Sequence, residues 1–251
     1  MRSWPTVYIP ELPERFEVPQ LSLFNSANAA LSPVPKQDTY RIYVCGITPY
    51  DATHLGHAAT YLIFDVMIRY LKASGADVKF VQNITDVDDP LFERAIRDGV
   101  DWQELANSQI ELFRGDMSDL HVIPPDHYIG VVEAMPLVID AVTKLDEKKS
   151  TYLVQGDKYF RVHSDPHFGE RSHLTEADAL NIFAERGGDP QRSGKEDPFD
   201  ALVWKAQFDI TSSRTANVKA VTKYMQEQAV VLPAPTLGYS SNKLRCCKCF
   251  T

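Results

Sequence analysis

The hydrophobic pattern between residues 41 and 84 changes period twice. RIYVCGI, at residues 41–47, is an apolar and β-branched run that predicts a buried strand. From about residue 56 to residue 74 apolar side chains recur at helical spacing, and Gly75 then ends the pattern. VKFVQNI, at residues 78–84, predicts a second strand. A strand, a helix and a strand in this order predict a βαβ unit of a parallel sheet.

The pattern downstream predicts more helix than strand. We expect acidic helices near 89–97 and 101–120, a break at Pro124 and Pro125, and a helix from about 128 to 147. A hairpin over 151–154 and 158–162 and a helix over about 175–184 follow. Residues 1–38, rich in proline and polar residues, predict an extended arm. We expect one α/β domain over 39–206, with an insertion at about 121–175, and a divergent tail over 207–251.

Composition narrows the classes of partner. The 251 residues suffice for one large domain, and 44% hydrophobic and 24% charged residues are ordinary for a soluble protein. A net charge of -8, without a cluster of Lys and Arg, argues against nucleic acid held by a broad basic surface. No secretory signal opens the sequence, and no run reaches the ~20 apolar residues of a membrane span. We therefore expect a cytoplasmic monomer that acts on small molecules and binds no membrane.

The strongest chemical signal is CGITPYDATHLGH, at residues 45–57. It joins the carboxyl end of a predicted parallel strand to a helix N-terminus, where α/β sheets bind ligands and unpaired N–H groups attract phosphate. Gly56 would allow a ligand to approach the backbone closely. His54 and His57 could donate hydrogen bonds to phosphate oxygens as charge builds in a transition state. The pair could also serve only to cap the helix.

This segment resembles the HIGH signature of the class I aminoacyl-tRNA synthetases, in the form found in the cysteinyl branch. NITDVDD, at residues 83–89, is similar to a second segment of that branch. KEDPFD at 195–200, with Trp204 and Lys205, resembles a third. The resemblance implies a Rossmann-like parallel sheet with a helical and hairpin insertion, and a reaction that uses ATP with Mg²⁺ to form an aminoacyl adenylate.

The resemblance also implies roles for individual residues. His54 and His57 would be catalytic. The residues that would line the pocket for ATP and cysteinyl adenylate are Cys45, Gly46, Ile47, Thr48, Thr60, Asn83, Ile84 and Thr85. Thr60 follows Gly56 by one helical turn and could face the same cleft as His57, or it could be a hydroxyl on the helix surface. Asp86, Asp88 and Asp89 are better explained as a helix N-cap cluster than as a metal site.

Cys45 has a physical reason to bind zinc. An enzyme for cysteine must reject serine, and apolar fit discriminates only about 10–200-fold for a methylene-sized difference. Zinc prefers a thiolate, and an open zinc site needs about three protein ligands plus one position for the substrate. The family resemblance makes Cys45 one ligand of a single Zn²⁺ per subunit. The alternative is a small buried residue at the end of a strand.

Three details resemble the actinobacterial cysteine ligases of the mycothiol pathway, which join L-cysteine to glucosaminyl-inositol instead of to tRNA. They are Ile47 with Pro49, Pro90 closing DVDDP, and the segment Glu185, Arg186, Gly187, Gly188, Asp189 and Pro190. That segment could shape a pocket for the sugar acceptor, or it could be a glycine C-cap. The expected function is ATP-dependent ligation of L-cysteine to glucosaminyl-inositol. A cysteinyl-tRNA synthetase and a catalytically inactive fragment are the alternatives.

The family pattern ends near Ala206. No KMSKS loop and no further zinc-ligand segment is recognisable in residues 207–251. Cys246, Cys247 and Cys249 lack the C-x₂₋₄-C spacing of a zinc site. We interpret the tail as the product of a shifted or prematurely ended reading frame. His121, His127, His163, His167 and His173 have no metal-type spacing, and we expect them in loops or on the surface.

Overall fold

The computed structural model describes residues 1–11, 13 and 18–205. The predicted tail at 207–251 therefore lies outside the described residues. Contacts divide the chain into two units, and each forms its own cluster. Among described residues, the first unit holds 1–11, 13, 18 and 37–136, and the second holds 19–36 and 137–205. The sequence analysis placed an arm at 1–38 and an insertion at about 121–175, so its boundaries differ from these.

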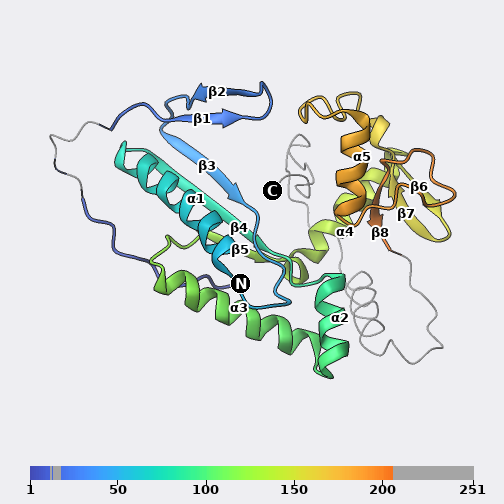
Figure 1. The fold of residues 1–251 in the computed structure, drawn as a ribbon, viewed down its shortest axis with the longest axis horizontal. Coiled ribbons are helices and arrows are strands. Elements are labelled where there is room, and N and C mark those ends of the chain that lie inside the picture. The colour runs from blue at the N-terminus through green and yellow to red at the C-terminus, as the bar shows by residue number, and fades with distance from the viewer. Residues whose placement is uncertain (12, 14–17, 206–251) are drawn as a thin grey trace. The chain divides into compact units, whose positions relative to one another are not determined.

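The first unit is built on a parallel sheet of order β3-β4-β5 (Figure 1). Its strands are β3 (Thr39–Val44), β4 (Asp77–Ile84) and β5 (His127–Gly130), and both neighbouring pairs run parallel. Helix α1 (Leu55–Ala73) connects β3 to β4 and lies alongside these strands. The βαβ unit predicted from the change in hydrophobic period is therefore confirmed.

Strand β5 corrects one prediction. The sequence analysis began a helix at about residue 128, but residues 128–130 belong to β5, and helix α4 begins after them (Val131–Glu147). Four residues are too short to show a period that separates strand from helix. The pairing with β4 decides the conformation, because Tyr128 lies opposite Gln82 and Gly130 opposite Ile84. Pro136 lies inside α4, directly before the boundary between the units.

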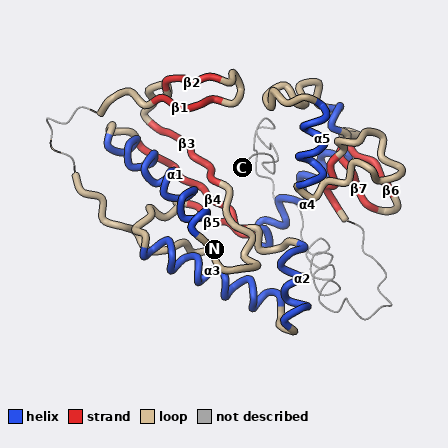
Figure 2. The backbone as a smooth tube through the Cα atoms, in the orientation of Figure 1, coloured by secondary structure: helices blue, strands red, loops and turns tan. Residues whose placement is uncertain are grey.

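Two further helices follow β4, joined by a short loop (Figure 2). Helix α2 (Asp89–Asp98) begins at the N-cap Asp88 and ends at Gly99, which adopts a left-handed conformation with φ 68°. Helix α3 (Trp102–Asp119) begins at Asp101, whose carboxylate accepts hydrogen bonds from two backbone N–H groups of the first turn. Phe92 and Trp102 pack edge to face and hold the two helices together.

The core of the first unit is aromatic. Phe113 of α3 is fully buried, and its ring contacts those of Tyr61 on α1 and Trp4 near the N-terminus. Trp4 also packs on Tyr128 of β5, and its indole N–H donates to the carbonyl of Val122. Residues near the start of the chain are therefore part of this core.

The second unit contains two small antiparallel sheets. One is the hairpin of β1 (Ser22–Asn25) and β2 (Ala30–Pro33), which the sequence analysis did not distinguish from extended arm. The other has the order β6-β7-β8, with β6 (Thr151–Val154), β7 (Asp157–Phe160) and β8 (Ala201–Trp204). The predicted hairpin is thus confirmed. A 3₁₀ turn (Val162–Ser164) and helix α5 (Glu176–Glu185) lie between β7 and β8. None of the described helices is long and apolar enough to cross a bilayer.

Phe113 gives a test of the aromatic core. Phe113→Ala should lower the free energy of unfolding by about 3–5 kcal/mol, because a cavity replaces a fully buried ring. Leu112→Ala, at a neighbouring side chain that is 46% exposed, should change it by less than about 0.5 kcal/mol. Urea unfolding followed by tryptophan fluorescence measures both, since Trp4 and Trp102 lie in this unit. Equal losses for the two variants would contradict the assignment of this core.

Candidate active site

The ends of β3 and β4 approach each other too closely for a side chain at Gly46. A Cβ placed on Gly46 would lie 1.6 Å from the carbonyl oxygen of Asn83. The amide oxygen of Asn83 accepts hydrogen bonds from the backbone N–H of Gly46 at 2.9 Å and from the hydroxyl of Tyr43 at 2.9 Å. Asn83 therefore holds the chain where it leaves β3.

Two further contacts continue this junction. The N–H of Thr85 donates to the carbonyl of Ile47 at 3.0 Å, and the Thr48 hydroxyl lies 3.3 Å from a carboxylate oxygen of Asp88. Ile84 is fully buried and Ile47 nearly so. The predicted residues 46–48 and 83–85 are thus brought together as one surface at the carboxyl ends of two parallel strands, where α/β proteins bind ligands.

The two histidines form a reciprocal cap at the start of α1. Nδ1 of His54 accepts from the N–H of Gly56 at 3.0 Å, and Nδ1 of His57 accepts from the N–H of His54 at 3.3 Å. Their ring centroids are 4.1 Å apart. The capping alternative therefore describes the geometry of this turn. Each cap uses Nδ1 of its ring, so Nε2 of each ring can still take a catalytic role.

The cap determines the tautomer of both rings. A backbone N–H can only donate, so each Nδ1 must be unprotonated, and the proton of each neutral imidazole sits on Nε2. Burial lowers the pKa of His57, and the neighbouring His54 lowers it further. His57 is therefore held neutral, with Nε2–H as its hydrogen-bond donor. This is the form suited to binding an anionic oxygen without giving up a full proton.

Cys45 precedes this turn in the sequence and Thr60 follows it. Each residue takes part in a hydrogen bond to a backbone carbonyl. The Thr60 hydroxyl donates to the carbonyl of Gly56 at 3.1 Å, so in this structure it is bonded to its own helix. The carbonyl of Cys45 accepts from the hydroxyl of Tyr61 at 3.2 Å. Burial raises the pKa of Tyr61, and the nearby Cys45 raises it further, which keeps this donor protonated. The side chain of Cys45 is exposed, so the alternative of a buried small residue does not apply.

The described residues do not complete a zinc site. No group of three or more His, Cys, Asp and Glu side chains among them is arranged to hold a metal ion. Cys45 is the one predicted ligand, whereas an open zinc site needs about three. The described side chains alone therefore do not supply enough ligands for a zinc ion. Zinc binding by Cys45 stays a prediction.

Two carboxylates of the acidic segment at 86–89 accept hydrogen bonds at the starts of helices. Asp88 caps α2 and accepts from the N–H of Asp89, as the N-cap reading predicted. Asp86 is buried and accepts from the N–H of Val132, at the start of α4. Burial raises the pKa of Asp86, and the hydrogen bonds from Val132 and Val131 offset part of the rise. A Cβ on Gly130 would lie 2.5 Å from the Asp86 carboxylate, so glycine is needed there too.

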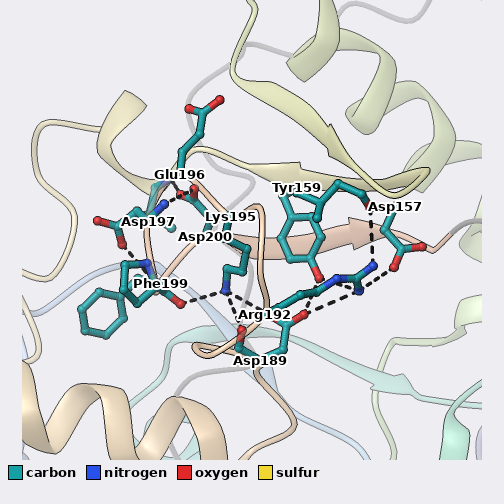
Figure 3. A network of polar contacts seen from close by, with 12 residues as sticks. Asp157, Tyr159, Asp189, Arg192, Lys195, Glu196, Asp197, Phe199 and Asp200 are labelled. Carbon is teal, nitrogen blue, oxygen red and sulfur yellow. Dashed lines mark hydrogen bonds and ion pairs between the residues drawn. The ribbon is translucent and has the colours of Figure 1, made fainter.

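The segment at 185–190, in the second unit, ends α5 with a glycine cap. Gly187 has a φ of 85°, and the N–H groups of Gly187 and Gly188 donate to the carbonyls of Ala184 and Phe183. Asp189 then enters a polar network (Figure 3). Its carboxylate accepts from the hydroxyl of Tyr159 and from the ammonium of Lys195, which is nearly fully buried. The capping reading describes the geometry, and contact with a sugar stays a prediction.

The same network fixes the KEDPFD segment. Arg192 pairs with the buried Asp157 at 2.7 Å and donates to the hydroxyl of Tyr159, as Figure 3 shows. Asp200 accepts from the Tyr152 hydroxyl at 2.6 Å and from the N–H of Val162 at 2.9 Å. Buried charges of this kind are tolerated only when paired, and here each has partners. The segment therefore has a structural role in its own unit.

Three residues near the histidine turn escaped the sequence analysis. Tyr43 donates to Asn83 from 40 residues away, and Arg94 and Asp116 contact the loop before α1 from 44 and 63 residues away. Local pattern carries no sign of these contacts. Arg94 resembles an ordinary helix-surface cation, since it also pairs with Asp98 at i+4.

Comparison with known families agrees with this geometry. The sequence model of the class I (C) tRNA synthetase catalytic domain matches residues 32–214. The chain belongs to this family. Its fold is accordingly the α/β fold of a class I tRNA synthetase catalytic domain, as the HIGH-like segment predicted. The remaining histidines were predicted to lie in loops or on the surface. This prediction is confirmed, because the structure exposes His121, His127, His163, His167 and His173.

Several curated relatives share a more specific name. L-cysteine:1D-myo-inositol 2-amino-2-deoxy-alpha-D-glucopyranoside ligase of Thermomonospora curvata is 54% identical over 211 residues, covering 82% of this chain and 51% of its own. Ligase 2 of that name in Corynebacterium jeikeium is 55% identical and covers 82% and 50%. The Gordonia bronchialis ligase is 53% identical and covers 83% and 51%. The chain thus spans about half the length of these relatives.

One solved structure is also similar. Methionyl-tRNA synthetase of Mycobacterium tuberculosis, bound by methionyl-adenylate, matches 60% of this chain and 36% of its own, with 18% identity and a TM-score of 0.42.

Gly46 provides a test of the strand junction. Gly46→Ala should lower the free energy of unfolding by about 1–3 kcal/mol or more, because the added methyl meets the Asn83 backbone. Gly115→Ala is the matched control: α3 leaves open space there, so alanine should add about 0.4–1 kcal/mol. Urea unfolding measures both. A neutral Gly46→Ala would show that the two strand ends do not approach as described.

The histidine cap predicts a pH response. Because the pKa of His57 is lowered by folding, the unfolded chain binds its proton first as the pH falls. The stabilising effect of neutral His57 is complete above the unfolded pKa of about 6.5 and is lost as the pH falls toward the lowered folded value. Long-range ¹H–¹⁵N NMR should show Nδ1 of both rings unprotonated at neutral pH.

In His54→Asn, which keeps a capping side chain, the pKa of His57 should rise only part of the way to its ordinary value. Burial, the larger cause of the lowering, is unchanged in this variant. A His57 that titrates at or above the value of a model peptide in the native chain would contradict the cap.

Proposed function

We propose that this chain carries the adenylate-forming part of a ligase that joins L-cysteine to glucosaminyl-inositol. The observation that carries the proposal is the identity of 54% to a ligase whose printed name specifies L-cysteine and the amino sugar. The surface of residues 46–48 and 83–85, next to the helix N-terminus of α1, supports it on physical grounds. It lies at the carboxyl ends of two parallel strands, beside two imidazole donors and the positive end of the helix dipole.

The reaction has two steps. A carboxylate oxygen of cysteine attacks the α-phosphorus of ATP, and the bond to the β-phosphate oxygen breaks to release pyrophosphate with its Mg²⁺. The amine of glucosaminyl-inositol then attacks the carbonyl carbon of the adenylate. It loses a proton, and AMP leaves with the electrons of the broken C–O bond. The product is an amide.

The chain's contribution to the first step is electrostatic. Negative charge grows on the phosphate oxygens as pyrophosphate leaves, and Nε2–H of His54 and His57 would donate to those oxygens. Both rings are already held in the donating tautomer by the cap, so little reorganisation is needed when the charge develops. The N-terminus of α1 adds its partial positive charge.

Two parts of the proposal rest on the family alone. A zinc ion held in part by Cys45 would bind the thiolate of the substrate cysteine, but the described residues lack the other ligands, so no step is derived through it. Contact of 185–190 with the acceptor would fall to the exposed Glu185 and Arg186, because the carboxylate of Asp189 is engaged by Lys195 and Tyr159. We propose that the acceptor is the sugar amine rather than tRNA, because the names of the relatives specify the amino sugar.

ATP–pyrophosphate exchange tests this function. With zinc and Mg²⁺ present, L-cysteine should support exchange by the purified chain, and L-serine should support at least about 10²-fold less. Removing one imidazole donor should lower the rate constant by about 10²–10³-fold, so His54→Ala is the main variant. His173→Ala, at an exposed histidine of the second unit, should leave exchange unchanged.

The outcomes separate the three readings. Exchange with cysteine, followed by amide formation with glucosaminyl-inositol, supports the ligase. Exchange followed by transfer to tRNA alone would favour a cysteinyl-tRNA synthetase. No exchange by a folded chain would favour the inactive fragment and would defeat the proposal for this chain.

A further inference from the structure

The loop that leads from β3 into the histidine turn has no regular secondary structure of its own. Residues 49–54 lie between the buried Ile47 and the first turn of α1. Pro49 is fully buried, and the Thr48 hydroxyl is held by Asp88 at the start of α2. Within the loop, the N–H of Tyr50 donates to the carbonyl of Thr48, and the N–H of Ala52 donates to the Asp51 carboxylate. These short-range bonds shape the turn, and contacts from α2 and α3 fix it against the rest of the unit.

Arg94 of α2 provides the first of these contacts. Its Nη1 donates to the carbonyl of Tyr50 and lies 3.2 Å from the Asp51 carboxylate. Its Nε donates to Asp98 at 3.1 Å, one turn along the same helix, which fixes the plane of the guanidinium. The Arg94 side chain is 23% exposed, whereas that of Asp51 is 71% exposed. An ion pair so exposed contributes little, so the hydrogen bond to the Tyr50 carbonyl is the contact that holds the loop.

Asp116 of α3 provides the second contact. Its carboxylate accepts from the hydroxyl of Thr53, and both side chains are half-buried. Thr53 directly precedes His54, the N-cap of α1. A displacement of Thr53 therefore moves the imidazole that caps the helix. Helices α2 and α3 pack together through Phe92 and Trp102, so both contacts come from one rigid pair of helices.

We propose that Arg94 and Asp116 are positioning residues for the histidine cap. They clamp the loop 50–53 on both sides and so determine where the His54 and His57 rings stand. The clamp rests on the proposed function only for its effect on catalysis, because its effect on ring position is independent of any reaction. Neither residue touches the reacting atoms in this scheme.

The chain offers matched controls for both residues. Arg97 lies on the same helix as Arg94 and hydrogen-bonds to the same Asp98, but its side chain is 70% exposed, and its interaction with the loop is an electrostatic one with Asp51. Asp119 lies one turn from Asp116 on α3 and is exposed. Arg94→Met is thus compared with Arg97→Met, and Asp116→Ala with Asp119→Ala. Arg94→Lys keeps the charge but loses the fork that reaches Tyr50 and Asp98 together.

The first readout is spectroscopic. ¹H–¹⁵N spectra of the imidazoles should shift for His54 and His57 in Arg94→Met and Asp116→Ala, with Arg94→Lys between these and the native chain. Neither control should move these signals. Circular dichroism and urea unfolding identify any variant that fails to fold, and Thr53→Val, which removes only the hydroxyl, then substitutes for Asp116→Ala.

The second readout is kinetic. In cysteine-dependent exchange, Arg94→Met and Asp116→Ala should lower kcat by about 10–100-fold, because a small misplacement of a catalytic group acts on the transition state. The KM for ATP should change less than about threefold, since ground-state binding does not depend on ring position. In a double-mutant cycle, Thr53→Val and Asp116→Ala should be far from additive, because each removes the same hydrogen bond.

The results decide the clamp and the function separately. If folded Arg94→Met and Asp116→Ala leave the ring signals where the controls leave them, the clamp is wrong, whatever the exchange rate. If the native chain shows no exchange, the proposed function fails, and the ring signals still decide the clamp. Equal kinetic loss in Arg97→Met and Arg94→Met would also overturn it, since only general helix electrostatics would then be at work.

Discussion

The close approach of β3 and β4 at their carboxyl ends is the constraint on which the candidate site depends. Asn83 can hold Gly46 and Tyr43 with one amide oxygen only because residue 46 has no side chain. That contact starts a junction that continues through Ile47 and Thr85. It directs the chain toward the first turn of α1. Any larger residue at 46 would separate the strand ends and, with them, the two segments that we propose line the adenylate pocket.

The histidine turn shows one set of atoms used for two purposes. Backbone N–H groups at a helix start need acceptors, and Nδ1 of His54 and of His57 supply them. The same bonds place the remaining proton on Nε2, where a phosphate oxygen could use it. Capping and catalysis are therefore compatible readings of this turn. Serine or aspartate would also cap the helix, so the physical reason for histidine at these positions is its second ring nitrogen, which can donate to a ligand.

The sequence predicted elements better than it predicted their partners. The helix before Gly75 and the strands on either side show clear periods, and the structure has them within a few residues. Strand β5 was missed because its four residues carry no distinguishing period and depend on pairing with β4. The glycine cap at 187 was one of two open readings, and its positive φ decides the geometry in favour of a cap.

By itself the sequence determined the family, the βαβ order and the identity of the turn that carries His54 and His57. These follow from short-range pattern and from a long motif, both of which are written locally in the chain. Only the tertiary structure decided that Asn83 supports Gly46, that Asp116 reaches Thr53 and that Arg94 reaches Tyr50. These contacts join residues 37, 63 and 44 positions apart. Local propensity cannot encode them, because the pairing of β3 with β4 and the packing of α2 against α3 bring the partners together.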